Sequence, residues 1–375
     1  MRFVSLLLIA VSTLSAQTTP KRPKLVLAIV VDQFRYDYLV KFRDQYNAGL
    51  SRLLQQGAVF TNAYYESFPT VTAIGHSTFL SGATPSVSGI VGNSWYDREA
   101  KRNVTSVSDA KETMLGGAGR GAAGDAASPR RMLVSTVGDE LKMAGRAAKV
   151  IGISIKDRSA ILPAGHMADG AYWFDPGSGN FVSSSYYFKA LPPWVEEFNK
   201  ARTADKYVAA EWKPIAGGAI FKTMASNPGK DYFTSLESTP YGNDLLVKFS
   251  EAAITHEKLG GHEGTDVLAL SLSSNDYVGH AKGPDDPQVR DISIRTDRLL
   301  GELFRFVEDV VVGVGALLFD LDVGVGLGER RPELRVDLVI QLRRGLVGPH
   351  IPIGEPAAIV ERHHLGAFRG RVDLD

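Results

Sequence analysis

Two threonines at the start of a run of small and apolar residues are the first positions that could do chemistry. Within Phe68–His76, Pro69, Thr70 and Thr72 precede the stretch Ala-Ile-Gly. This pattern is typical of the start of a helix, where unpaired backbone N–H groups and the positive end of the helix dipole favour an anion. Taken alone, Thr72 is either a helix cap or a nucleophile.

A second pattern pairs an aspartate with a histidine four residues later, at Asp276 and His280. On a helix this spacing puts both side chains on one face, so together they could hold one ion with ligands of the kinds that zinc accepts. Such pairs are also common on exposed helix faces. The pair by itself leaves both interpretations open.

Lys156 and Arg158 form a third pattern, two cations separated by one residue. In an extended chain, side chains i and i+2 point to the same side, so both cations are expected to grip one phosphate. The planar guanidinium of Arg158 suits two phosphoryl oxygens, and Lys156 would act as a point charge. A solvated basic pair is the alternative.

Three apolar segments are expected to be the strands that position these residues. Leu25–Val31 ends at Asp32, Lys149–Ile155 ends at Lys156, and Asp266–Leu272 comes just before the Asp-His pair. Continuous apolar runs of this kind are typical of strands that are buried on both faces of a parallel sheet. Open α/β sheets bind ligands outside the carboxyl ends of their strands, so the charged residues should share one site.

Helical and irregular segments are expected between these strands. Tyr36 to Gln56 is compatible with a helix that ends at Gly57, and Ser135 to Ala144 reads as a short amphipathic helix. The pattern loosens over residues 177–265, which are rich in aromatic residues and proline. We interpret this stretch as a cap inserted over the sheet, and a longer loop region is the alternative.

The segments around these residues resemble the alkaline phosphatase superfamily, in the branch that holds periplasmic phosphate monoesterases and type I phosphodiesterase/nucleotide pyrophosphatases. In that branch a Pro-Thr-x-Thr-x-x-x-His run carries the nucleophile on its second threonine, and an asparagine 21 residues later binds a phosphoryl oxygen. Thr72 and Asn93 have that spacing. Asp32 resembles the first metal-binding aspartate of the branch, and Asp276 with His280 resembles its Asp-x-x-x-His pair.

The resemblance implies an alkaline-phosphatase-like α/β sandwich with a largely parallel central sheet and helices on both faces. It implies hydrolysis of a small phosphate ester through a phosphothreonine on Thr72, with two zinc ions as cofactors. The implied metal ligands are Asp32, Thr72, Asp276 and His280, and the implied substrate ligands are Asn93, Lys156 and Arg158. The Lys-x-Arg pair occurs in the monoesterases of this branch, so the resemblance favours phosphate monoesters.

The resemblance ends near residue 308. In the family a later strand ends in an adjacent Asp-His pair, and a further histidine follows much later, but the corresponding place here reads Asp320-Leu321-Asp322. From Asp309 to Asp375 the chain has no Ser, Thr, Asn, Lys, Tyr, Trp or Met, residue types that turns and surfaces normally use. We hypothesise that the reading frame changed near Glu308. A divergent, arginine-rich helical tail is the alternative.

The composition and the first residues limit the classes of protein to which this chain can belong. Lysine plus arginine and aspartate plus glutamate both total 42 in the 375 residues, so no global field attracts nucleic acid or an anionic membrane. The absence of cysteine excludes disulfides, thiol chemistry and a cysteine-derived sulfatase. Arg2, the apolar run Phe3–Val11 and a small-residue site near Ala16 are typical of a signal peptide over residues 1–16, which predicts a periplasmic or secreted protein.

These observations lead to one main prediction and two alternatives. Residues 17–308 are expected to form the catalytic domain of a zinc-dependent phosphate monoester hydrolase, and residues 309–375 an atypical tail. Because the tail lacks the Asp-His pair, a non-catalytic or truncated member with an incomplete metal site is the first alternative. A phosphodiesterase or nucleotide pyrophosphatase is the second.

Overall fold

A seven-stranded sheet forms the centre of the computed structural model, which describes residues 22–61, 63–118, 126–311, 316–321 and 340–341. The five strands from β14 to β9 run parallel, and β10 and β6 are antiparallel to their neighbours. In spatial order the strands are β14 (Ala316–Leu321), β1 (Leu25–Val31), β13 (Asp266–Leu272), β8 (Val150–Ser154), β9 (Gly170–Asp175), β10 (Asn180–Ser184) and β6 (Met114–Leu115).

Both faces of the sheet are buried, and alternate residues of each strand pack on opposite faces. In β1, Leu27 and Ile29 belong to the larger core cluster, whereas Ala28 packs with residues of the opposite face. In β13, Leu268 likewise belongs to the larger core cluster, and Ala269 packs on the opposite face. This alternation follows from the two-residue period of a strand and explains why these segments are apolar without interruption.

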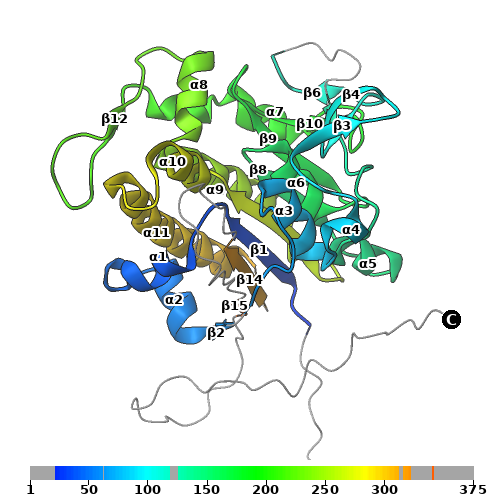
Figure 1. Cartoon of the computed structure of the whole chain (residues 1–375), viewed down its shortest axis with the longest axis horizontal. Coiled ribbons are helices and arrows are strands. Elements are labelled where there is room, and N and C mark those ends of the chain that lie inside the picture. The colour runs from blue at the N-terminus through cyan, green and yellow to red at the C-terminus, as the bar shows by residue number, and fades with distance from the viewer. Residues whose placement is uncertain (1–21, 62, 119–125, 312–315, 322–339, 342–375) are drawn as a thin grey trace, which may run out of the picture. The chain divides into compact units, whose positions relative to one another are not determined.

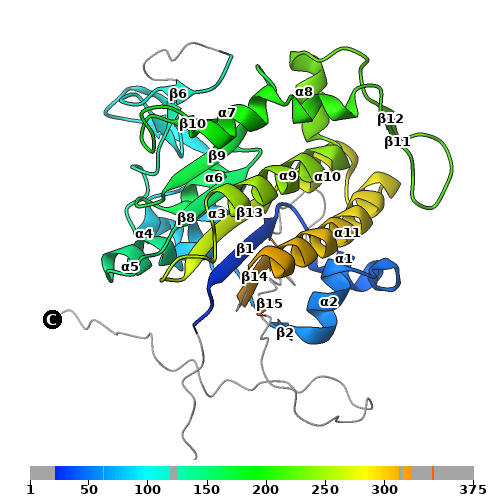
Figure 2. The ribbon, with the colours of Figure 1, turned by 180° about the vertical axis from the view of Figure 1, so that it is seen from behind.

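Helices cover both faces (Figures 1 and 2). One face carries α3, α5 and α6, and the other carries α1, α2, α7, α8, α9 and α11. The helices are α1 (Tyr36–Lys41), η1 (Arg43–Gln45), α2 (Gly49–Gln56), α3 (Thr72–Ser81), α4 (Pro85–Ser88), α5 (Val137–Met143), α6 (Asp157–Ala164), α7 (Pro193–Lys200), η2 (Thr203–Tyr207), α8 (Lys230–Glu237), α9 (Pro240–His256), α10 (Ser274–Lys282) and α11 (Pro287–Val310). None of the helices in the described part of the chain is long and apolar enough to cross a membrane.

Four pairs of short strands lie outside the central sheet. The pairs are β3 (Ser94–Asp97) with β4 (Arg102–Thr105), β5 (Ser108–Asp109) with β7 (Ala126–Ala127), β11 (Glu211–Trp212) with β12 (Lys222–Thr223), and β2 (Ala58–Val59) with β15 (Ile340–Gln341). The first pair begins directly after Asn93, so it holds one end of the segment that carries this predicted substrate ligand.

The predicted strands coincide with β1 and β13 over their full lengths, and β8 is one residue shorter than expected at each end. The predicted helix 36–56 is instead broken into α1, η1 and α2, and α2 does end at Gly57. A buried side chain explains the break. The Asp297 carboxylate of α11 accepts hydrogen bonds from the backbone N–H groups of Asn47, Ala48 and Ser51, at 2.8, 3.0 and 3.1 Å.

The predicted cap over residues 177–265 differs from the structure at both ends. β10 is a strand of the central sheet, and α9 packs against that sheet. The elements outside these layers are α7, η2, the β11–β12 pair and α8. Of the aromatic residues that suggested a cap, Trp194 is buried, and Tyr186, Tyr187 and Phe188 are partly buried.

The predicted signal peptide, residues 1–16, lies outside the described residues and stays a prediction. Most of the predicted tail also lies outside them. The backbone of β14 is described, and it pairs in parallel with β1 from Val26↔Ala316 to Val31↔Leu321. This segment therefore extends the sheet beside β1, while Asp322 and the histidines at 350, 363 and 364 are not described.

Gly152 tests the close contact between β8 and α6. A Cβ atom at this position would lie 2.0 Å from the carbonyl oxygen of Ala160, and backbone cannot move aside as a side-chain end can. We expect Gly152→Ala to lower the free energy of unfolding by at least ~2 kcal/mol, measured by denaturant titration. Gly229→Ala is the control, because a Cβ atom there meets nothing within 4 Å, and equal losses in the two variants would contradict the proposed clash.

Candidate active site

The carboxyl ends of three neighbouring strands and the start of one helix meet at a single site. Asp32 follows β1, Lys156 lies between β8 and α6, and Asp276 lies in the first turn of α10, directly after β13. Thr72 is the first residue of α3. All four residues are less than 8% exposed, so the structure brings together residues that are far apart in the sequence.

The Lys156 ammonium lies at the centre of this site. Its Nζ is 2.5 Å from an Asp32 carboxylate oxygen and 2.5 Å from an Asp276 carboxylate oxygen, and it donates to Thr72 Oγ1 at 3.4 Å. Burial alone would lower the pKa of Lys156, but the two carboxylates outweigh it and raise the pKa. The site therefore contains a charged lysine between two acids.

The two carboxylates respond in opposite directions. For Asp32, burial favours the neutral acid, but Lys156 and its other cationic neighbours lower the net pKa. For Asp276, burial and the negative charge of Asp32 raise the pKa. The pKa values of two carboxylates that share one cation move apart in this way because the two negative charges repel each other.

The side chain of Asn93 is hydrogen-bonded to the start of α3. Its Oδ1 accepts a hydrogen bond from the Ala73 backbone N–H at 2.8 Å, next to Thr72. The Thr72 hydroxyl lies 3.5 Å from Asp32, at the limit of a hydrogen bond. Thr72 is the first helical residue after the N-cap Val71, so its side chain does not cap the helix. This removes the cap interpretation that the sequence left open.

His76 fixes the position of α3, a role that the sequence prediction did not assign. Its Nδ1 lies 2.8 Å from the Thr72 carbonyl oxygen, and its Nε2 lies 2.8 Å from the Ser271 hydroxyl of β13. Complete burial lowers its pKa to about 4, so the ring is neutral at pH 7. In the tautomer that satisfies both contacts, Nδ1–H donates to Thr72 and Nε2 accepts from Ser271. The histidine of the Pro-Thr-x-Thr-x-x-x-His run was the available sequence signal.

Arg158 corrects one sequence prediction. Lys156 has extended backbone, but Arg158 lies inside α6, so the premise of two side chains on one side of an extended chain is wrong. The guanidinium nevertheless lies close enough to the site for its charge to help lower the pKa values of Asp32 and His76. Its Nε is buried and has no hydrogen-bond partner in the described structure, and its contact with Asp157 is 3.5 Å long.

His280 lies at the exposed edge of the site. Its Nε2 is 3.2 Å from the second carboxylate oxygen of Asp276, and its Nδ1 is 3.5 Å from the amide nitrogen of Gln33. The histidine and the aspartate therefore lie on one face of α10, as their spacing predicts. The side chain of His280 is 63% exposed, which leaves it accessible from solvent.

The donor atoms around the Lys156 ammonium are of the kinds that bind divalent cations. Two carboxylates and a hydroxyl surround the point that the Lys156 ammonium occupies, and an imidazole is bonded to one of the carboxylates. Among the described residues, however, no three His, Cys, Asp or Glu side chains gather closely enough to form a complete metal site. The described residues therefore do not form a complete site for either of the two predicted zinc ions.

Comparison with known proteins gives consistent similarities. The family model described as type I phosphodiesterase / nucleotide pyrophosphatase matches residues 26–313. The chain is 38% identical over 325 residues to the alkaline phosphatase PhoV of Synechococcus elongatus and 37% identical over 346 residues to the alkaline phosphatase PafA of Elizabethkingia meningoseptica. These alignments cover 80% and 85% of this chain, but only 58% and 63% of the relatives, so the chain spans less than two thirds of their length.

Solved structures agree with the sequence matches. The crystal structure of wild-type PafA superimposes with a TM-score of 0.74 at 34% identity and covers 81% of this chain and 63% of that protein. A PafA variant with one threonine, one asparagine, one lysine and one arginine substituted superimposes with a TM-score of 0.75. The likeness confirms the predicted fold class, a mixed α/β structure with a largely parallel central sheet.

Lys156→Ala tests the buried charge cluster. Its removal leaves two carboxylates facing each other without a cation, so we expect the metal-free protein to lose about 3 kcal/mol or more of unfolding free energy at pH 7.5. Chemical denaturation in the presence of a chelator measures this. Arg158→Ala is the control, since Arg158 makes no ion pair with either carboxylate, and an equally large loss there would contradict the central role of Lys156.

The lowered pKa of His76 predicts that the unfolding free energy of the protein depends on pH. Because burial, the largest cause, lowers its pKa from 6.5 to about 4, the unfolded chain binds a proton at pH values where the native protein does not. The stabilisation from the neutral ring is thus complete above pH 6.5 and is lost as the pH falls toward 4. Between pH 7.5 and pH 5 the loss from this group is about 2 kcal/mol.

The variant His76→Asn separates this titration from all others in the protein. It is expected to be less stable than the wild type at pH 7.5, and its unfolding free energy should fall by about 2 kcal/mol less between pH 7.5 and pH 5. Parallel pH profiles for the two proteins would show that His76 is not held neutral.

Proposed function

The chain belongs to the type I phosphodiesterase / nucleotide pyrophosphatase family, and we propose that it hydrolyses phosphate monoesters with Thr72 as the nucleophile. The observation that carries this proposal is the meeting of Thr72, Asp32 and Lys156 at the carboxyl edge of the sheet. The names of two relatives, both alkaline phosphatases, support the monoester class.

The substituted PafA variant supports the proposed residue roles. Its four altered residue types are the same as those of Thr72, Asn93, Lys156 and Arg158. The separation between the threonine and the asparagine, and that between the lysine and the arginine, are also the same as in this chain. These four residues are therefore the best candidates for nucleophile and phosphoryl ligands.

Three of the four residues have the following proposed roles in the reaction. The hydroxyl of Thr72 attacks phosphorus, the P–O bond to the leaving alcohol breaks, and water then cleaves the phosphothreonine. The Asn93 amide group can donate to a phosphoryl oxygen, because its Oδ1 is already used by the start of α3. The unpartnered Nε of Arg158 provides a further donor for an anion.

Zinc is the proposed cofactor, with Asp32, Asp276, His280 and Thr72 as the residues that would hold it. Zinc, when bound, supplies a Lewis acid that stabilises negative charge on oxygen, which a threonine hydroxyl needs because it is a weak nucleophile near neutral pH. Lys156 would then leave its position between the carboxylates and donate to a phosphoryl oxygen. Its long, flexible stem makes this movement possible.

A non-catalytic role for this chain has one specific observation in its favour. No complete set of metal ligands gathers among the described residues. In this alternative the site binds phosphate or one cation without turnover. The test of function therefore has to include metal content as well as rate.

Thr72→Ala tests the nucleophile. With Zn²⁺ present, we expect the wild type to hydrolyse p-nitrophenyl phosphate and Thr72→Ala to lose at least ~10³-fold in kcat/KM. Thr78→Ala, on the same helix but bonded to the Ala83 carbonyl, should keep near-wild-type activity. Zinc content is measured on the same samples. Turnover that survives in Thr72→Ala would contradict the proposal, and an absence of both zinc and turnover in the wild type would favour the non-catalytic alternative.

Arg158→Ala tests the substrate class. A monoester carries one more unbridged oxygen than a diester, so losing a guanidinium donor should cost the monoester about 10²-fold in kcat/KM and the diester much less. The comparison uses p-nitrophenyl phosphate and bis-p-nitrophenyl phosphate. A wild-type preference for the diester, or equal losses on both substrates, would favour the phosphodiesterase alternative.

A further inference from the structure

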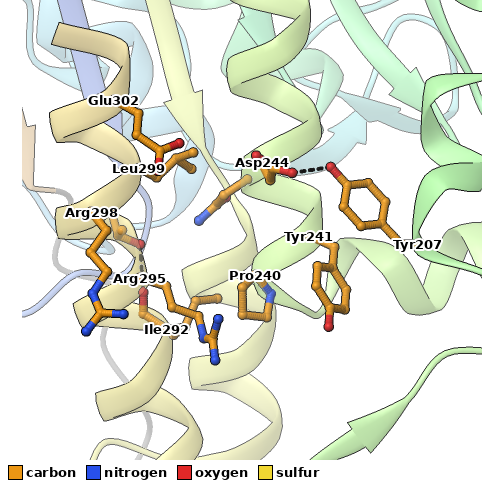
Figure 3. Close-up of a pocket in the computed structure, with 11 residues that line it drawn as sticks. Tyr207, Pro240, Tyr241, Asp244, Ile292, Arg295, Arg298, Leu299 and Glu302 are labelled. Atoms are coloured by element: carbon orange, nitrogen blue, oxygen red, sulfur yellow. Dashed lines mark hydrogen bonds between the residues drawn. The ribbon is translucent and has the colours of Figure 1, made fainter. Parts of the chain in front are cut away.

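A cavity of about 270 Å³ lies between α9, α11 and η2, on the face of the sheet opposite to α3 (Figure 3). We call it the α9–α11 pocket. The residues of α11 that line it include Ile292, Arg295 and Leu299, which repeat every three or four positions and so form one side of the helix. This volume is slightly below the ~300 to 1,000 Å³ that is typical of pockets for drug-sized ligands, so the pocket suits only a smaller molecule.

Apolar and aromatic groups line the middle of the pocket. Ile292 and Leu299 lie on the α11 side. Tyr207 and Tyr241 lie on the other side, with their rings stacked at a centroid distance of 4.9 Å. The Tyr207 hydroxyl donates to the Asp244 carboxylate, and burial, together with that carboxylate, raises its pKa, so the hydroxyl keeps its proton.

A hydrogen-bonded network makes one wall of the pocket rigid. Asn243 donates to the Asn275 side-chain carbonyl at 2.8 Å and accepts from the Ser274 backbone N–H at 3.1 Å. Thr296 donates to the same Asn275 oxygen at 3.2 Å. Both lining residues, Asn243 and Thr296, are at most 2% exposed, so the wall is formed before any ligand binds.

Opposite charges lie at the two ends of the pocket. Figure 3 shows Arg295 and Arg298 toward one end and Asp244 and Glu302 toward the other. Arg295 is already bonded to Asp291 and to the Lys213 carbonyl oxygen, each at 2.6 Å. Arg298 and Glu302, by contrast, make no hydrogen bond or ion pair with any described residue, although their four-residue spacing would allow them to pair.

A further cation near the acidic end, Lys248, pairs with a different carboxylate. Burial would lower the pKa of Lys248, but Glu251 raises it, and the negative charges of Asp244 and Glu302 add to this increase. Its ammonium, however, donates to Glu251 at 3.0 Å. The pocket therefore keeps a cationic end and an anionic end, separated by apolar walls.

We propose that the α9–α11 pocket binds a short zwitterion of the dipeptide class. The free carboxylate of such a ligand pairs with Arg298, its ammonium pairs with Glu302, and its apolar side chain lies against the tyrosine rings and Leu299. The four-residue step from Arg298 to Glu302 rises about 6 Å along the helix. An extended dipeptide spans up to ~7 Å, which matches that step, whereas a single α-amino acid has its two charges too close together.

Calorimetric titration with L-alanyl-L-leucine near pH 6.5 tests the proposal, because both termini of the dipeptide are then charged. We expect saturable binding that Arg298→Gln and Glu302→Gln each weaken by about tenfold. Both side chains are exposed, so the variants should fold normally. Arg305→Gln and Glu263→Gln are the matched controls, because both residues are exposed and lie outside the pocket, and they should leave the affinity unchanged.

The same dipeptide with an acetylated amino terminus and an amidated carboxyl terminus has the same shape without the charges. It should bind at least tenfold more weakly than the free dipeptide. Equal binding of the blocked and free dipeptides, an affinity that neither pocket variant changes, or no heat of binding at millimolar dipeptide would each overturn the proposal. The measurement does not depend on Thr72 or on metal, so its failure is distinct from failure of the phosphatase proposal.

Discussion

The buried ammonium of Lys156 between Asp32 and Asp276 is the constraint on which the rest of the structure depends. A charge out of water is costly unless partners surround it, and a cation between two acids is stable only if all three lie within hydrogen-bond distance. Asp32 directly follows β1, Lys156 lies just after β8, and Asp276 lies in the first turn of α10 after β13, so these three strands have to keep their register. A slip of one residue would reverse the side chains and separate the charges.

The same charges explain how one site can serve two states. Without a metal ion, Lys156 neutralises the carboxylates. In the proposed zinc-bound state the ion would take the place of the ammonium, and Lys156 would then be free to donate to a phosphoryl oxygen together with the unpartnered Nε of Arg158. Under this proposal the two carboxylates would never face each other without a cation, because Lys156 would neutralise them whenever no metal ion is bound.

The sequence was sufficient to predict the three strands whose carboxyl ends meet at the site, because apolar runs that end in charged residues indicate both a buried strand and the sheet edge where a ligand binds. The roles of the individual site residues stay predictions. β1 and β13 were predicted to the residue. The sequence was not sufficient to predict that Asp297 causes the break before α2, or that His76 links α3 to β13. Both depend on contacts between segments about 200 or more residues apart, which local patterns do not contain. The extended geometry assumed for the Lys-x-Arg pair was wrong because β8 leads directly into α6, so only Lys156 of the pair has extended backbone.

The bonds from Asp297 to the start of α2 join residues about 250 positions apart. During synthesis, α2 therefore lacks its capping partner until α11 has left the ribosome, an interval of about 10 to 50 seconds at ordinary elongation rates. β1 has to wait almost as long for β13. The amino-terminal quarter of the chain thus leaves the ribosome as a strand and helices without neighbours, and the fold closes only when late segments return to early ones.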